Sequence, residues 1–153
     1  MIFKLLTISS LCLLAIAYPS GAPEGSCDLR IPGHMVEPQT SPAPFKVEAV
    51  SLGGGKYKIT IKSTDSNDFK GFLLAVVDSA GKYIGNFGSS TNSKTLTCPK
   101  GNALTHIDNV GKKKVEIEWT KPASATGSID LMATIVRDYS TFWTNAKTTI
   151  TLA

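Results

Sequence analysis

The sequence predicts an all-β protein built as an antiparallel β-sandwich. Apolar and polar residues alternate with period two in several short segments, which is typical of strands with one buried and one solvated face. Gly, Pro, Asn, Asp and Ser separate these segments, and no window keeps a helical period with caps at both ends. Seven or eight short strands in this arrangement favour two packed antiparallel sheets in a single domain.

The alternating segments each have a clear inward set. The first expected strand lies in PFKVEAVSL (44–52), and the GGGK sequence (53–56) after it is typical of a hairpin turn rather than a phosphate loop, since Tyr57 follows the lysine. The four later segments are KYKITIKS (56–63), KVEIEWT (114–120), SIDLMATIV (128–136) and KTTITLA (147–153). Their predicted inward residues are Tyr57, Ile59, Ile61, Val115, Ile117, Trp119, Ile129, Leu131, Ala133, Ile135, Thr148, Ile150 and Leu152.

One segment, FKGFLLAVVD (69–78), departs from this pattern because it is apolar on both faces. It predicts an interior strand with one face in the core and the other covered by a loop, by the N-terminal lead-in or by a neighbouring edge. A bulge at Gly71 would bring Phe69 and Phe72 to the same side. KYIGNF (82–87) is expected to pair with it across a short turn containing Gly81, and THID (105–108) is a further short strand candidate.

The chain opens with a predicted secretory signal peptide, residues 1–17. Lys4 precedes an apolar run, and the small residues Ala15 and Ala17 favour cleavage after Ala17. An uncleaved anchor is the alternative, but the run is shorter than the roughly 20 residues of a transmembrane helix. The predicted domains are therefore the signal peptide and one sandwich domain, 18–153, in a secreted, extracellular protein with no membrane span.

Charge and cysteine content narrow the class further. The formal net charge is +4, and loss of Lys4 would leave a mildly basic chain without the basic clusters that nucleic-acid binding requires. Cys12 lies within the leader, so Cys27 and Cys98 remain as an even pair in an oxidising compartment. We expect one disulfide between them, with free or intermolecular thiols as the alternative. The segment 18–44, rich in Pro, Gly and Ser, predicts an irregular lead-in held by Cys27.

Several of these motifs together resemble the reeler (reelin N-terminal) domain family. They are YPSGAPEGSC (18–27), PGH (32–34), PQTSPAPF (38–45), FKGFLLAVVD (69–78), Thr105-His106, WTKP (119–122), GSIDLMATIV (127–136) and Phe142-Trp143. The sequence is most similar to the small, secreted, single-domain insect defence proteins of that family. The resemblance implies an immunoglobulin-like β-sandwich, a disulfide matching Cys27 and Cys98, and a role in innate immunity, with some members recognising bacterial or fungal surface components.

Candidate ligand-binding residues are a basic turn and one aromatic side chain. Lys112, Lys113 and Lys114 could contact anionic microbial polymers as point charges, or could simply be a solvated turn. Phe142 and Trp143 have opposite parity, so burial of Phe142 would leave Trp143 outside or under a loop, where an exposed indole could stack on a sugar ring.

The chain offers little acid–base chemistry. His34 and His106 are its two histidines, and neither lies in a recognisable nucleophile motif. We expect His106 to hydrogen-bond a neighbouring loop and His34 to have a similar structural role. The sequence thus predicts no enzyme, no catalytic residues, no metal and no cofactor.

The function predicted from these features is non-enzymatic innate-immune defence through binding of lipopolysaccharide, lipoteichoic acid or β-glucan. The alternative is an extracellular adhesion or structural module that binds a host protein.

Overall fold

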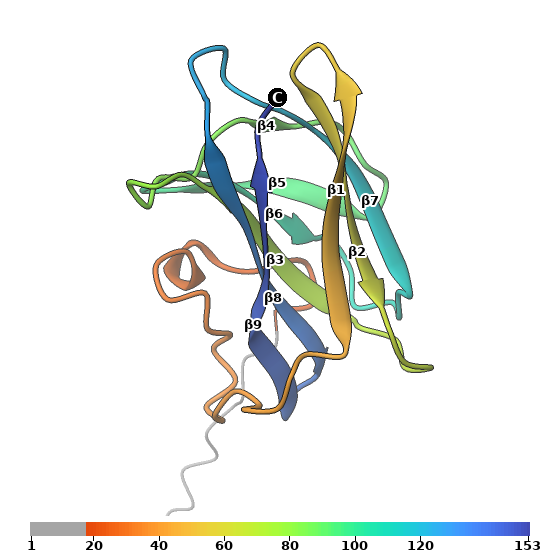
Figure 1. Ribbon diagram of the computed structural model, residues 1–153. Coiled ribbons are helices and arrows are strands. Elements are labelled where there is room, and N and C mark those ends of the chain that lie inside the picture. The colour runs from red at the N-terminus through yellow and green to blue at the C-terminus, as the bar shows by residue number, and fades with distance from the viewer. Residues whose placement is uncertain (1–17) are drawn as a thin grey trace, which may run out of the picture.

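The computed structural model describes residues 18–153, so the predicted signal peptide and Cys12 lie outside the described residues. Two antiparallel sheets face each other (Figure 1). One has the strand order β1-β2-β7-β4 and the other β5-β6-β3-β8-β9, as a β-sandwich requires. The strands are β1 (Phe45–Gly53), β2 (Lys56–Ser63), β3 (Gly71–Val77), β4 (Asn86–Phe87), β5 (Ser93–Cys98), β6 (Gly101–His106), β7 (Lys114–Thr120), β8 (Ser128–Asp138) and β9 (Thr141–Thr151).

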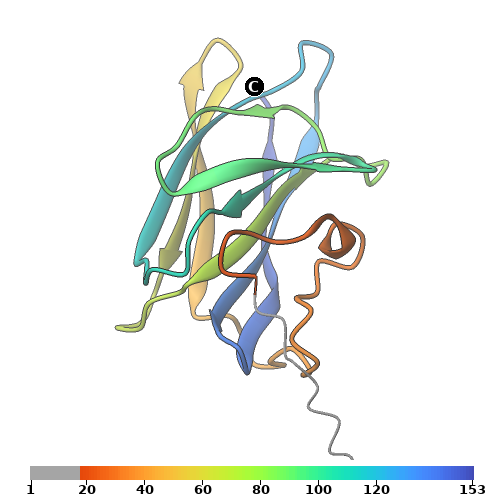
Figure 2. The ribbon, with the colours of Figure 1, turned by 180° about the vertical axis from the view of Figure 1, so that it is seen from behind.

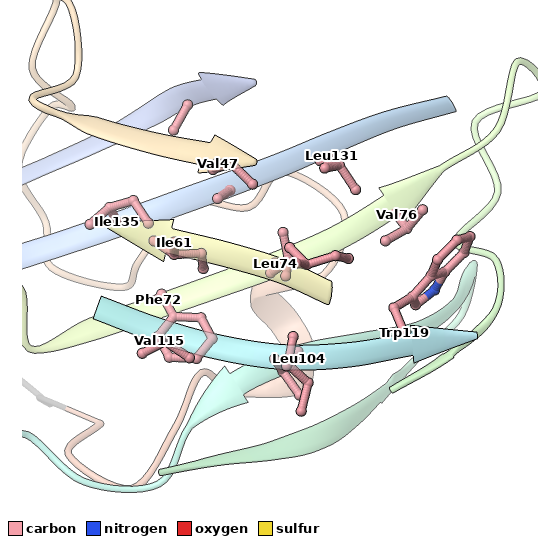
Figure 3. Close-up of a cluster of buried hydrophobic side chains, with 14 of the residues drawn as sticks. Val47, Ile61, Phe72, Leu74, Val76, Leu104, Val115, Trp119, Leu131 and Ile135 are labelled. Carbon is pink, nitrogen blue, oxygen red and sulfur yellow. The ribbon is translucent and has the colours of Figure 1, made fainter. Parts of the chain in front are cut away.

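The core between the sheets is made by the residues that alternation placed inward. Ile59, Trp119 and Leu131 have no exposed surface. Figure 3 shows side chains from both sheets packing together, among them Trp119 and Ile61 from one sheet and Leu131 and Leu74 from the other. On the opposite face of the four-stranded sheet, several ion pairs join neighbouring strands, as in Lys56–Glu118 at 2.8 Å and Lys62–Glu48 at 2.9 Å. Period-two alternation therefore predicted both faces of β2 and β7 correctly.

Strand β3 is buried on both sides, as its sequence predicted. Phe72, Leu74 and Val76 belong to the core between the sheets. Leu73, Ala75 and Val77 face the other way and pack in a second cluster with Cys27, Tyr83, Cys98 and Ala103. Phe69 also lies in the main core, 6.3 Å from Phe72 between ring centroids, so these two rings are on the same side.

The lead-in, residues 18–44, covers the outer face of the five-stranded sheet as a partial third layer (Figure 2). Its regular structure is one 3₁₀ turn, η1 (Glu24–Ser26). The predicted disulfide between Cys27 and Cys98 is present, and the Tyr83 hydroxyl donates a 2.6 Å hydrogen bond to the Cys27 carbonyl. The lead-in is thus fixed covalently and by polar contacts to the sheet beneath it.

The structure has one strand more than the upper number expected, and the unexpected one is β5. Its sequence, SKTLTC, is mostly polar because β5 is the edge of its sheet and pairs only with β6. THID was predicted as a strand, but β6 ends at His106 and starts earlier, at Gly101. Edge strands with few buried side chains give a weak periodic signal.

KYIGNF pairs with β3 only over its first half. Tyr83 forms an isolated bridge with Val77, but β4 then joins β7 in the opposite sheet. The chain crosses between the sheets at Gly85, which has φ +77°. A Cβ at this position would lie 2.4 Å from the Trp119 indole, so the crossing requires glycine on both grounds.

Candidate functional site

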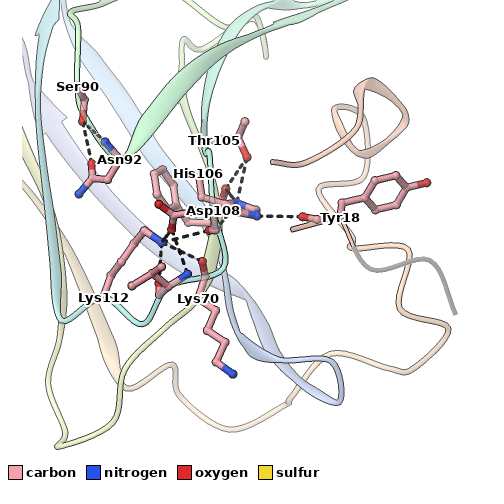
Figure 4. Close-up of polar contacts among 10 residues, drawn as sticks. Tyr18, Lys70, Ser90, Asn92, Thr105, His106, Asp108 and Lys112 are labelled. Carbon is pink, nitrogen blue, oxygen red and sulfur yellow. Dashed lines mark hydrogen bonds and ion pairs between the residues drawn. The ribbon is translucent and has the colours of Figure 1, made fainter. Parts of the chain in front are cut away.

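Lys112 is buried, which corrects the prediction that it is a solvent-exposed point charge. Its side chain is 6% exposed, and its ammonium donates to Asp108 Oδ1 at 2.6 Å and to the Val110 carbonyl at 2.7 Å (Figure 4). An isolated bridge between Lys112 and Phe69 brings this residue against the start of β3, and residues 108–110 wrap around its nitrogen. Lys112 therefore closes a loop and is not available to a ligand.

Lys113 and Lys114 remain at the surface. Lys113 pairs with Asp68 at 3.0 Å and also donates to the Ser66 carbonyl, while Lys114 pairs with Glu116 at 3.2 Å. All four charged side chains are about half exposed, so these pairs contribute little to stability and can exchange with other anions. The basic turn is thus reduced from three lysines to two, each beside a carboxylate.

Trp143 is also buried, contrary to the expectation of an exposed indole. The sequence placed either Phe142 or Trp143 in the core, and the structure puts Trp143 there, packed edge-on against Phe45. Phe142 faces outward but is covered by the lead-in, where its ring meets His34 at 5.8 Å. Both rings are buried because the sheet has a cover on each side, so Trp143 is not a platform for a sugar.

His106 has both ring nitrogens engaged. Nδ1 accepts from the Phe72 N–H at 3.1 Å, which leaves Nε2 to donate to the Tyr18 carbonyl at 3.2 Å (Figure 4). The expected hydrogen bond to a neighbouring loop is therefore present, and the loop is the lead-in. Burial lowers the pKa of His106, so the neutral ring that this tautomer requires is the favoured form at neutral pH.

His34 lies in the lead-in and stacks on Tyr139, with ring centroids 4.9 Å apart. Its Nδ1 is buried without a hydrogen-bond partner among residues 18–153, and burial lowers the pKa of this imidazole. No group of three potential metal-ligating side chains occurs in the described part of the chain. The two histidines line the same hollow but do not form a metal site with a carboxylate.

That hollow is a cavity with a volume of about 210 Å³. Its roof is the lead-in, from Tyr18 to His34, and its floor is the outer face of the five-stranded sheet. The floor is formed by Gly71, Leu73, Thr134 and Val136. Sequence reasoning missed this cavity because it forms between segments more than 35 residues apart. One sequence feature could have drawn attention to Arg30, because it is the only Lys or Arg in residues 18–44.

These features define the class of protein as a disulfide-linked, immunoglobulin-like β-sandwich with a covering N-terminal segment. Residues 25–152 match the sequence model of the Reeler domain. The chain belongs to the reeler domain family. Among solved structures, it is similar to the human F-spondin reeler domain (fragment 1), with a TM-score of 0.61 over 78% of this chain and 94% of that one. At 16% identity, this likeness shows the fold alone.

Curated proteins similar to this chain include defence proteins and ferric-chelate reductases. "Putative defense protein 3" of Antheraea mylitta is 32% identical over 144 residues, covering 91% of this chain and 88% of the relative. "Putative defense protein 2" of the same species is 35% identical, covering 85% and 87%. Ferric-chelate reductase 1 of Bos taurus is 33% identical over 135 residues, but the match covers 22% of its length. Of these, only the defence proteins are matched over nearly their whole length.

Among residues 18–153, no helix is long and apolar enough to span a bilayer.

Proposed function

We propose that this chain is a secreted, non-enzymatic defence protein that binds components of microbial surfaces. The observation that carries the proposal is the match, over most of both lengths, to relatives named as defence proteins. The reductase match covers about a fifth of that much longer protein, so it gives no reason to transfer a redox activity. The names of these relatives support a defence role in general. That the ligand is a component of microbial surfaces is our own inference.

A non-enzymatic role is supported by the state of the histidines. His106 has both nitrogens bonded to main-chain groups, so it is not free to take a proton from a substrate. His34 is held between aromatic rings, and no serine or cysteine hydroxyl or thiol hydrogen-bonds to it within the described residues. A binding protein needs none of this chemistry, because a rigid sandwich can present its loops without moving.

Lys113 and Lys114 are the remaining candidates for contact with anionic polymers such as lipopolysaccharide or lipoteichoic acid. Their ion pairs are exposed, so a multivalent phosphate polymer can compete with Asp68 and Glu116. Contacts of this kind weaken with salt because the Debye length falls from about 10 Å at 0.1 M to about 3 Å at 1 M.

The test is binding of the purified protein to intact bacteria, lipopolysaccharide, lipoteichoic acid and β-glucan at low and moderate salt. The double variant K113S/K114S should bind anionic polymers more weakly than the parent. The matched control, K56S/K147S, removes two exposed, ion-paired lysines whose partners, Glu118 and Asp130, are not those of the turn, and it should bind like the parent. Equal losses in both variants would indicate that overall charge acts rather than this turn. Absence of binding to every microbial component would contradict the proposal.

A second candidate is an extracellular module that binds a host protein. The supporting observation is the exposure of two large apolar side chains in the lead-in, Leu29 at 75% and Met35 at 86%. Large apolar side chains left exposed on one segment are a feature of protein interfaces. Recovery of a single host protein from haemolymph or serum, lost on L29S/M35S substitution, together with no microbial binding, would favour this alternative.

A further inference from the structure

The cavity beneath the lead-in has the character of a small-ligand site. Its volume is about 210 Å³. An engineered apolar protein cavity of roughly 150 Å³ binds benzene, whereas sites for drug-sized molecules measure about 300 Å³ or more. The cavity beneath the lead-in therefore has room for one ring or one alkyl chain of medium length. A lipid with two or more acyl chains would not fit.

The wall of the cavity is suited to an apolar guest. Pro19, Ala22, Pro32, Leu73 and Val136 contribute apolar surface. Two of the polar side chains among them are already bonded to protein groups: the Thr134 hydroxyl donates to the Arg30 carbonyl at 2.6 Å, and His106 bonds Phe72 and Tyr18. A hydrocarbon needs no hydrogen-bond partner, so it can lie against the apolar residues without disturbing these bonds.

Two cations line the same cavity without a carboxylate partner. Nine ion pairs occur among residues 18–153, and none involves Arg30 or Lys70. Asp138 is the only acidic residue of the lining, and its carboxylate accepts hydrogen bonds from the Ser140 N–H and hydroxyl, both at 3.0 Å. With neutral histidines, the lining has two positive charges and one negative, a net charge of +1. Figure 4 shows the Lys70 side chain extending away from the Lys112 cluster.

Buried polar atoms without hydrogen-bond partners also occur in residues that line this cavity. Four buried side-chain polar atoms lack a partner in the described residues, and two of them, Arg30 Nε and His34 Nδ1, belong to residues that line the cavity. The His34 residue is 9% exposed. Buried polar groups in native proteins are nearly always bonded, so two exceptions at one cavity require an explanation. Arg30 also has a positive φ of 54°, a strained conformation for a non-glycine residue that is enriched at ligand sites.

We propose that this cavity binds a small, single-chain amphiphilic anion, with the hydrocarbon under the lead-in and the acid group at Arg30 and Lys70. The apolar wall selects the tail, and the uncompensated cations select the sign of the head group. The volume restricts the ligand to a free, medium-chain acid, as opposed to the acyl chains of a membrane lipid. The site differs from the basic turn at Lys113 and Lys114, so it goes beyond the proposed function.

The experiment is an NMR titration of ¹⁵N-labelled protein with sodium decanoate, decan-1-ol and decyltrimethylammonium. The two ionic amphiphiles are kept below their critical micelle concentrations and the alcohol below its solubility limit. Decanoate should shift the amide signals of Gly71, Leu73 and Val136 and bind about tenfold more tightly than the cationic amphiphile, since a charge-assisted hydrogen bond contributes about this factor. Vesicles of diacyl phosphatidylglycerol should leave these signals unchanged, which separates a free acid from a membrane lipid.

Two variants test the head-group contact. R30Q should weaken decanoate binding about tenfold and leave decanol binding nearly unchanged. K46Q, which removes an exposed lysine from β1 in the other sheet, should bind decanoate like the parent. If R30Q fails to fold, K70Q and the comparison of the three amphiphiles test the same contact.

The proposal is overturned if decanoate shifts no signals around the cavity, or if the cationic amphiphile binds as tightly as decanoate. A protein that binds decanoate but no microbial component retains this site and loses the proposed defence function. A protein that binds microbial components but not decanoate keeps the proposed defence function and rejects only the proposed cavity ligand.

Discussion

At the scale of single residues, burial decides which charges can act outside the molecule. Three consecutive lysines look alike in the sequence, but the ammonium of Lys112 is surrounded by the Asp108 carboxylate and by main-chain carbonyls. This contact also lowers the pKa of Asp108, first through the hydrogen bond from Lys112. Its neighbours remain in solvent. The difference arises from one backbone bridge to Phe69, which no local pattern indicates.

Replacing Lys112 by methionine should therefore destabilise the protein, while K113M should not. The K112M change leaves the Val110 and Lys70 carbonyls without their donor, a loss of about 2 kcal/mol in the free energy of unfolding. K113M removes an exposed pair and should change it by less than about 0.5 kcal/mol. Urea unfolding followed by tryptophan fluorescence measures both. Equal stabilities would show that the buried ammonium has no structural role.

His106 makes stability depend on pH. Burial lowers its pKa below the ordinary value of 6.5, so the unfolded chain takes up a proton more readily than the folded one. Stability should be constant above about pH 6.5 and should fall as the pH decreases below this value toward the lower folded pKa. Urea midpoints at intervals from pH 8 to pH 5 measure the profile, and H106Q should make it shallower. The slope that remains belongs in part to His34, whose pKa is also lowered by burial. A folded pKa at or above 6.5 for His106, determined by NMR, would contradict this account.

At the scale of elements, short connections determine which sheet a strand joins. The segment after β3 pairs with it for two residues and then enters the other sheet as β4. The switch occurs at Gly85, where the main chain passes over the face of the Trp119 indole. The indole N–H donates a 3.0 Å hydrogen bond to the Ile84 carbonyl, which holds the crossing in place.

G85A should destabilise the protein far more than G81A. Both glycines have φ +77°, so each substitution incurs the strain of a left-handed alanine, about 1 kcal/mol. Only at Gly85 does the new Cβ meet the indole, whereas at Gly81 nothing lies within 4 Å. The clash should add about 2 kcal/mol or more. Urea unfolding of both variants isolates this steric part. Equal losses would mean that Trp119 moves aside freely.

At the scale of the whole molecule, the lead-in converts a two-layer sandwich into a three-layer structure on one side. It is attached by the disulfide, by the Thr134–Arg30 hydrogen bond and by the contact of Ala22 N–H with Thr105. The cover explains why β3 and the Phe142-Trp143 pair are apolar on both faces. It also creates the cavity, which exists only between lead-in and sheet.

Removal of the disulfide by C27A/C98A should lower the free energy of unfolding by about 4 kcal/mol, as chain entropy predicts for residues 71 apart. The two sheets share a core that does not include these cysteines, so the variant should retain its β-structure by circular dichroism. Limited proteolysis should cut first within residues 18–44. Proteolysis that begins elsewhere, with the lead-in intact, would show that its polar contacts suffice without the bridge.

Sequence periodicity predicted the fold well where a strand has one wet face. The inward sets of β2, β7 and β8 are confirmed residue by residue, and the double-sided burial of β3 was correctly attributed to a cover. The edge strand β5 was missed because its side chains are mainly polar. The candidate site was predicted less well, since the burial of Lys112 and Trp143 and the cavity at Arg30 depend on contacts between distant segments, which alternation does not encode.

The two ends of the described residues have different surroundings. Tyr18 borders the cavity, and its carbonyl accepts a hydrogen bond from His106 Nε2. At the other end, Ala153 donates its N–H to the hydroxyl of Tyr57 on the four-stranded sheet. If the chain is cut after Ala17, as the sequence predicts, an affinity tag or surface anchor joined to Tyr18 lies beside the cavity and hinders ligand uptake. Immobilisation through the carboxyl side leaves the cavity mouth open, and biosensor measurements should adopt this orientation.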